Sequence, residues 1–115
     1  SLQAPVNIAV FAGESPLSQK IGIQIPADAT PLGICTSSGT VGPSLSFGKA
    51  DAMMIVCKSC ALADAYATAF ANTIQTADDI PACMARIGKE ADILSAICIK
   101  DDKTGIFGGF ELKFF

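Results

Sequence analysis

The chain has 115 residues, of which 50% are hydrophobic and 17% are charged, and its formal net charge is −3. This composition excludes a disordered chain, and the scattered Lys and Arg residues form no basic stripe that could neutralise the phosphates of a nucleic acid. No apolar run approaches the ~20 residues that a membrane span requires. We therefore expect a single domain over residues 1–115, with no nucleic acid and no membrane as its partner.

The first half of the chain is predicted to form three strands. Residues 6–12 are an apolar run expected to be a buried strand, and residues 19–26 alternate with period two, so the pair predicts a hairpin. Residues 27–33 are rich in turn formers, and residues 34–48 form a loop rich in Ser, Thr and Gly. Residues 51–57 are apolar on both faces, which predicts a central strand.

The second half is predicted to hold two helices and two further strands. Ser59 can act as the N-cap of a helix over residues 59–74, and a second helix is expected from Asp78 or Asp79 to Lys89, with Pro81 in its first turn. Strands are expected over residues 93–100 and 109–115, with a turn at residues 101–105. This order predicts an α+β fold in which two helices pack on one face of an antiparallel or mixed β-sheet.

The chain has no histidine and five cysteines. Histidine is the commonest general base and transition-metal ligand, so without it catalysis would use carboxylates, hydroxyls, thiols, Lys or a hard metal ion. The cysteines lie in apolar segments, which favours reduced, buried thiols and hence a cytoplasmic protein. Cys57-Lys58-Ser59-Cys60 is a CxxC at the start of a predicted helix, and a redox pair is the alternative interpretation there.

One stripe of the first predicted helix is polar, because Cys60, Asp64, Thr68 and Asn72 are four residues apart. A carboxylate and a hydroxyl one turn apart can share a hard cation such as Mg²⁺. A solvated face of an amphipathic helix would show the same pattern.

The Ser/Thr/Gly loop offers backbone N–H groups and hydroxyls that could hold phosphate oxygens, although it lacks the ending of a P-loop. Such a loop can also be a plain connector. Beyond the loop, Lys49 could neutralise a phosphate, and Asp51 could orient it or cap the loop. A surface ion pair is the competing explanation for both residues.

The run GICTSSGTVGPSLSFGKADAMMIV, followed by ALADAYATAFAN, resembles an uncharacterised family of the ApbE-like superfamily. The best known relatives are flavin transferases, which use FAD and Mg²⁺ to attach FMN covalently to a protein. In those enzymes a helical Ala-Asp-x-x-x-Thr-Ala motif contributes metal ligands, and residues 63–69 match it, which implies Asp64 and Thr68 as ligands. Ser37-Ser38-Gly39 is similar to a segment that lies near the nucleotide.

The resemblance implies a site for Mg²⁺ and for FAD or another nucleotide. The expected partner is accordingly a small anionic ligand. The implied cofactor-binding residues are Thr36, Ser37, Ser38, Gly39, Thr40, Gly42, Ser44, Ser46, Lys49 and Asp51. The expected reaction is phosphoryl or FMN transfer, and no catalytic residue is identified. The alternatives are a non-enzymatic module that binds a small ligand or a protein, and the CxxC redox protein.

The sequence also departs from the transferases. The His-rich stretch and the Asp-Pro-x-Thr-Gly motif that precede the helix in the transferases are missing here. Residues 102–105 (Asp-Lys-Thr-Gly) are similar to the second motif, but they follow the helix and lack the Pro. Pro43 stands where relatives often have His.

The resemblance covers nearly the whole chain, but only the C-terminal half of such a protein. The apolar content is also high for an isolated domain, which suggests that another surface covers this one. We therefore expect an N-terminal half as the partner, either as a second chain or as a part cut from the full protein, with a homo-oligomer as a further alternative.

Overall fold

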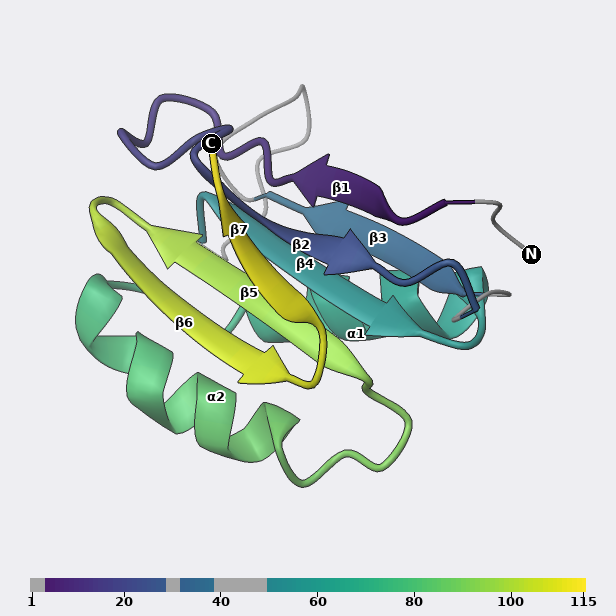
Figure 1. The fold of residues 1–115 in the computed structure, drawn as a ribbon. Helices are drawn as coiled ribbons and strands as arrows, with labels where there is room; N and C mark the ends of the chain where they lie inside the picture. Colours follow the sequence, from purple (N-terminus) through teal and green to yellow (C-terminus); the bar gives the residue numbers. More distant parts are fainter. Residues whose placement is uncertain (1–3, 29–31, 39–49) are drawn as a thin grey trace.

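The computed structural model describes residues 4–28, 32–38 and 50–115, and Figure 1 shows its fold. The elements follow one another as β1 (Val6–Ala9), β2 (Ile21–Ile25), β3 (Gly33–Ser37), β4 (Ala52–Cys57), α1 (Cys60–Ala71), the short 3₁₀ helix η1 (Ala77–Asp79), α2 (Ile80–Ile87), β5 (Ser95–Lys100), β6 (Lys103–Gly108) and β7 (Glu111–Phe114).

The described strands form two antiparallel sheets, one in the order β1-β2-β7 and the other in the order β3-β4-β5-β6. The three-stranded sheet lies over one face of the four-stranded sheet, and α1 and α2 cover the opposite face (Figure 1). The predicted α+β class, with antiparallel strands and two helices on one face, is confirmed. The strands divide between two sheets because β4 and β5 are apolar on both faces and need cover on each side.

Strand β4 is the centre of the molecule, and all six of its residues are buried. Met53, Ile55 and Cys57 belong to the core beneath the helices. The alternate residues Ala52, Met54 and Val56 belong to the core between the sheets. The prediction of a central strand, apolar on both faces, is confirmed.

The predicted first strand is shorter and more exposed than expected. The hairpin is confirmed, since β1 pairs antiparallel with β2 from Val6 opposite Ile25 to Ala9 opposite Gly22. However, β1 ends at Ala9 and its residues are mostly exposed, whereas Val10 and Ala12 beyond it are buried. The predicted strand over residues 6–12 is therefore confirmed for residues 6–9, and its predicted burial holds only for residues beyond them. As an edge strand with one neighbour, β1 packs mainly through Ile8.

Two strands occupy segments that were predicted as turn or loop. Strand β3 begins at Gly33, where a turn was expected, and β6 begins at Lys103, inside the predicted turn at residues 101–105. Both are edge strands that pair through their backbones with the buried strands β4 and β5. The turn itself narrows to Asp101 and Asp102, with Asp101 in the left-handed region at φ 56°.

Helix α1 is confirmed, with Ser59 as its N-cap: the Ser59 Oγ accepts a hydrogen bond from the Leu62 N–H at 3.3 Å. Its buried side chains are mostly small, which lets the helix lie close to the sheet: Ala63, Ala67, Phe70 and Ala71. Helix α2 is also confirmed, with Pro81 in its first turn. Neither α1 nor α2, nor any other helix in the described part of the chain, has the length and apolarity needed to cross a bilayer.

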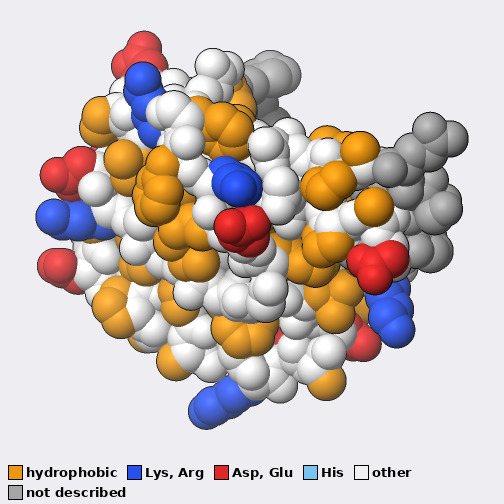
Figure 2. Space-filling view, viewed as in Figure 1, with side chains coloured by type: hydrophobic (Ala, Val, Ile, Leu, Met, Phe, Trp, Pro, Cys, Tyr) orange, Lys and Arg blue, Asp and Glu red, His pale blue; other side chains and the backbone are white. Residues whose placement is uncertain are grey.

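The three-stranded sheet is apolar inside and polar outside. Ile8, Ile23 and Leu112 form one cross-strand row that packs into the core between the sheets. Side chains alternate between the two faces of a sheet, so the adjacent row points to the outer face and consists of Asn7, Gln24 and Glu111. Figure 2 looks onto this sheet and shows apolar side chains interspersed with charges of both signs.

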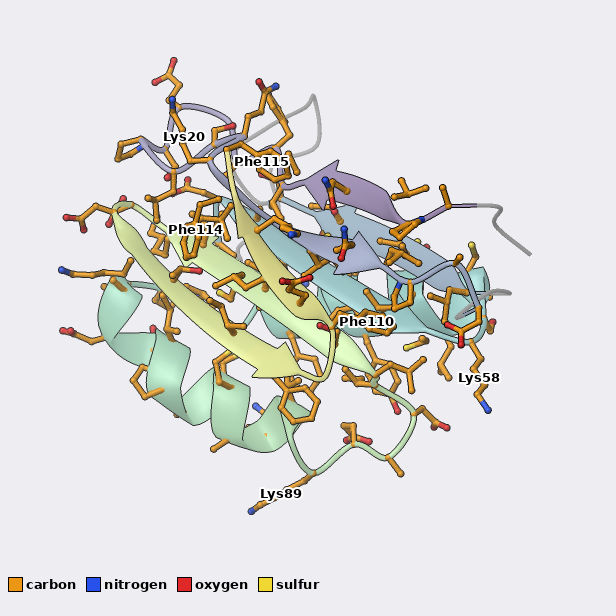
Figure 3. The ribbon with its side chains drawn as sticks, in the orientation of Figure 1. Lys20, Lys58, Lys89, Phe110, Phe114 and Phe115 are labelled. Atoms are coloured by element: carbon orange, nitrogen blue, oxygen red, sulfur yellow. The ribbon has the colours of Figure 1, made fainter. Side chains whose placement is uncertain are left out.

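The large exposed apolar residues include two at the end of β7. Phe114 is 74% exposed and Phe115 is 53% exposed. Both lie near Lys20 at one end of the sheet, whereas Phe110 lies at the other end (Figure 3). The Phe115 N–H donates to the Lys20 carbonyl at 2.8 Å, so the pairing of β7 with β2 continues to the last residue of the chain.

Candidate functional site

The two segments that carry the sequence motifs, β3 and α1, meet at Gly33. A Cβ atom on Gly33 would lie 2.2 Å from the Cys60 backbone nitrogen and 2.3 Å from the Ser59 carbonyl carbon. Only glycine therefore allows the first turn of α1 to lie against the start of β3 at this separation. This contact sets the register between the helix and the strand.

The register brings the two motifs to one edge of the four-stranded sheet. Strand β4 is antiparallel to β3, and α1 follows β4 directly and packs back along both strands, so α1 runs in the same direction as β3. A strand advances about 3.3 Å per residue and a helix about 1.5 Å, so two strand residues match about four helix residues. Starting from Gly33 beside Cys60, these rises put Cys35 near Asp64, in agreement with the influence of Asp64 on the Cys35 pKa, and they predict that Ser37 lies near Thr68.

The pairing of β3 with β4 decides which side chains share the helix face. Cys35 and Ser37 are opposite Ile55 and Met53, which lie in the core beneath the helices. Thr36 is opposite Met54, which lies in the core between the sheets, so Thr36 is on the other face of the sheet. Ser37 is therefore the β3 hydroxyl on the same side as Asp64 and Thr68.

Asp64 and Thr68 lie on consecutive turns of α1, and both are exposed. Their oxygens suit a hard cation such as Mg²⁺, which often binds through one or two carboxylates and takes its other ligands from water and phosphate. Across residues 4–28, 32–38 and 50–115, no group of three or more Cys, Asp or Glu is placed to hold a metal ion. A cation at Asp64 would accordingly need water or a ligand's phosphates to complete its shell.

Asp51 is engaged with the turn between β5 and β6. Its side chain is buried, and its Oδ2 accepts a hydrogen bond from the Asp101 N–H at 2.7 Å. The Asp51 N–H in turn donates to the Ile99 carbonyl at 2.9 Å. The carboxylate thus caps the turn that contains the left-handed Asp101, in the same way that a side-chain acceptor caps a helix.

The other predicted cofactor-binding residues divide between described and undescribed parts of the chain. Ser38 follows β3 and is half-buried. The remaining predictions lie outside the described residues: Gly39, Thr40, Gly42, Ser44, Ser46 and Lys49.

The structure gives Cys60 a neighbour that the CxxC spacing does not indicate. The half-buried Cys35 donates from its Sγ to the Cys60 carbonyl oxygen at 3.5 Å. Burial raises the pKa of the Cys35 thiol, and the nearby Cys60 and Asp64 raise it further. Cys57 is buried in the core beneath the helices, and burial raises its pKa as well. This neighbour was missed because β3 was expected to be a loop.

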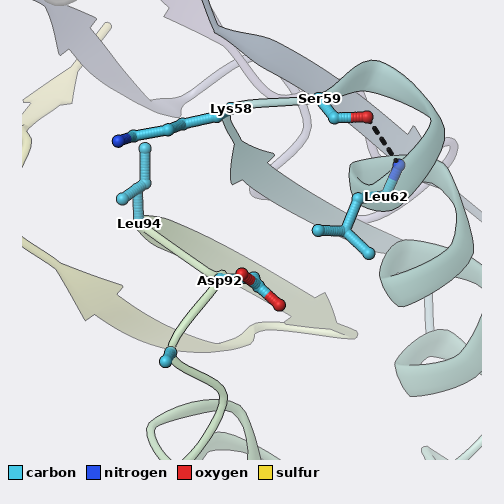
Figure 4. A pocket seen from close by; sticks show the side chains of 6 residues that line it. Lys58, Ser59, Leu62, Asp92 and Leu94 are labelled. Carbon is cyan, nitrogen blue, oxygen red and sulfur yellow. Dashed lines mark hydrogen bonds between the residues drawn. The ribbon is translucent and has the colours of Figure 1, made fainter.

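A pocket of about 240 Å³ lies beside the first turn of α1 (Figure 4). It is lined by Lys58, Ser59, Leu62, Ala91, Asp92 and Leu94. The Ser59 hydroxyl at its rim caps α1, as the dashed line in Figure 4 shows. Asp64 and Thr68 do not line this pocket, so it does not include the two predicted metal ligands. A second pocket, of about 320 Å³, lies between η1, the start of α2 and the start of β6.

Comparison with known proteins gives a consistent family. A family model described as AbpE bacteria matches residues 1–99. A UPF0280 protein of Methanocella arvoryzae is 39% identical over 104 residues, which are 90% of this chain and 42% of that protein. A UPF0280 protein of Methanoculleus marisnigri is 55% identical over 74 residues, which are 64% of this chain and 30% of that protein. A third, from Methanothrix thermoacetophila, is 33% identical over 104 residues, covering 90% of this chain and 43% of that protein. The chain therefore spans less than half the length of these relatives.

Proposed function

The chain belongs to the AbpE bacteria family, and we propose that its strand β3 and helix α1 carry part of a site for a divalent cation and a flavin or nucleotide. The observation that supports the proposal is the contact at Gly33, which fixes the register of α1 along β3. This register supports a site in which the carboxylate and hydroxyl of one motif and the hydroxyls of the other act together at one edge of the sheet.

In this proposal the residues of the chain have distinct roles. Asp64 and Thr68 hold the cation from the exposed side of α1, and Ser37 and Ser38 donate hydrogen bonds to phosphate oxygens of the ligand. The bound cation would supply neutralisation of the negative charge on those oxygens. Such a site serves phosphoryl transfer or FMN transfer, and FAD is the ligand to test first.

The relation to the ApbE-like superfamily is part of the same proposal. Residues 63–69 match the Ala-Asp-x-x-x-Thr-Ala motif of the flavin transferases, and the match falls within α1. Because the chain spans only 42% of the Methanocella arvoryzae protein, we propose that the other part of such a protein completes the site.

The test is a calorimetric titration of the chain with FAD in MgCl₂ and again in excess chelator. We expect the affinity for FAD to fall roughly ten-fold or more when Mg²⁺ is removed, and by a similar factor in Asp64→Asn with Mg²⁺ present. Thr68→Val, which keeps the side-chain shape and removes the hydroxyl, should weaken binding in the same direction.

The matched control is Asp102→Asn, which neutralises an exposed carboxylate in the turn between β5 and β6. It should bind FAD as the unaltered chain does. If Asp64→Asn also behaves as the unaltered chain, the proposed cation site is wrong. If FAD binds equally well in chelator, the chain is instead a binding module that does not use a cation.

A further inference from the structure

The described cysteines fall into two groups by accessibility. Cys57, Cys83 and Cys98 are at most 3% exposed and lie in the core beneath the helices. Burial raises the pKa of Cys98 to about 12, and it also raises the pKa of Cys83. These three thiols are therefore out of reach of a disulfide that arrives from solvent. Cys60 is exposed and Cys35 is partly so.

Cys35 and Cys60 come from different elements and meet at the contact between β3 and α1. At Gly33 the approach is so close that an added Cβ would lie 2.5 Å from the Cys60 Cα. Cys35 lies two residues further along the strand, on the face that carries α1. Its Sγ donates to the Cys60 carbonyl oxygen at 3.5 Å, and the nearby Cys60 side chain is among the causes that raise the Cys35 pKa.

We propose that Cys35 and Cys60 form a redox-active thiol pair, which closes to an intramolecular disulfide by exchange with a low-molecular-weight disulfide. The proposal does not depend on the proposed cation site. It also differs from a CxxC mechanism, because the partner of Cys60 is on the neighbouring strand rather than three residues earlier.

The exchange takes place in two steps. The exposed Cys60, as its thiolate, attacks one sulfur of oxidised glutathione; the glutathione S–S bond breaks, a Cys60–glutathione disulfide forms, and one glutathione thiolate leaves. Cys35 then loses its proton and attacks the Cys60 sulfur. The Cys35–Cys60 bond forms, and the second glutathione leaves. The two protein thiols are oxidised, one glutathione disulfide is reduced to two thiols, and the two protons released by the protein go to those thiols.

The chain offers a direct readout of which cysteines join. Trypsin cleavage after Lys and Arg places Cys35 in the peptide 21–49, Cys57 in 50–58, and Cys60 together with Cys83 in 59–86. The chain is incubated with oxidised glutathione, its free thiols are alkylated, and the digest is analysed by mass spectrometry without reduction. We expect a disulfide between 21–49 and 59–86, which disappears on reduction. A disulfide between 50–58 and 59–86, or glutathione that persists on Cys60 while Cys35 remains free, would overturn the proposal.

Two variants sharpen the result. Cys83→Ser leaves Cys60 as the single cysteine of peptide 59–86 and should keep the same linkage. Cys35→Ser removes the resolving thiol, so glutathione should accumulate on Cys60. If Cys35→Ser instead leaves Cys60 free of glutathione, Cys60 is not the attacking thiol and the proposal fails.

Discussion

The two sheets use the same strand pairing but are buried differently. In the four-stranded sheet, β4 and β5 are covered by helices on one side and by the other sheet on the opposite side, and nearly all their residues are buried. The three-stranded sheet is covered on its inner face only, and its edge strand β1 is mostly exposed. The buried strands β4 and β5 therefore support β3 and α1, and the three-stranded sheet covers their other face.

The largest effect should come from removing a side chain between the two sheets. Ile97 is fully buried there, and Ile97→Ala should lower the free energy of unfolding by about 3–4 kcal/mol, because it leaves a cavity in the layer that both sheets share. Denaturant unfolding measures this. Val6→Ala, at a residue of β1 that is 40% exposed, should cost less than about 1 kcal/mol. Equal losses would contradict the difference in burial between the sheets.

The contact between β3 and α1 gives the next largest effect. Gly33→Ala introduces a Cβ into the space occupied by the backbone of Ser59 and Cys60, which cannot move aside as a flexible side chain can. We expect a loss of about 2–3 kcal/mol in the free energy of unfolding. Gly109→Ala is the control, because an added Cβ there meets nothing within 4 Å, and its effect should stay below about 0.5 kcal/mol.

The N-cap of α1 should contribute less. Ser59→Ala removes the oxygen that accepts the Leu62 N–H, and we expect the thermal unfolding midpoint to fall by an amount equivalent to about 1 kcal/mol. Ser59→Asp keeps an acceptor at the N-cap and should restore most of the loss. If Ser59→Asp is as destabilised as Ser59→Ala, the hydrogen bond is not what stabilises the first turn.

The smallest effect is a pH dependence away from both sheets. The backbone N–H groups of Thr76 and Gln75 donate to the Asp79 carboxylate and hold its pKa below the ordinary 3.8. The resulting stabilisation is complete above pH 3.8 and is lost as the pH falls through the lower, folded-state pKa. The difference in unfolding midpoint between the chain and Asp79→Asn should therefore shrink from pH 6 to pH 2. A difference that stays constant over this range would show that the charge of Asp79 is not involved.

Much of the fold could be predicted because its signals are local. The apolar run of β4, the alternation in β2 and the caps of α1 each lie within the segment that they define. Strands β3 and β6 could not be found in this way, since Ser37 and Gly105 are typical of loops and these strands form by pairing with buried neighbours. The length of β1 was overestimated because an apolar run does not show where the pairing with the neighbouring strand ends.

The candidate site likewise has a part that local sequence predicts and a part that only tertiary contacts determine. The spacing of Asp64 and Thr68 along one helix is enough to place them on consecutive turns. The position of Ser37 level with Thr68 depends on the contact at Gly33, which no spacing in the sequence reveals. The same contact brings Cys35 close to Cys60, a neighbour that the CxxC spacing does not indicate.

The most direct test of the central claim, that β3 and α1 carry one site, uses paramagnetic broadening of amide signals in NMR spectra. Mn²⁺ replaces Mg²⁺ in the presence of FAD, and the chain is observed with and without the substitution Asp64→Asn. We expect the signals of Ser37, Ser38, Asp64 and Thr68 to broaden most strongly, with the effect falling off with distance from α1, and we expect Asp64→Asn to abolish it. Broadening confined to α1, or broadening that survives Asp64→Asn, would contradict the claim.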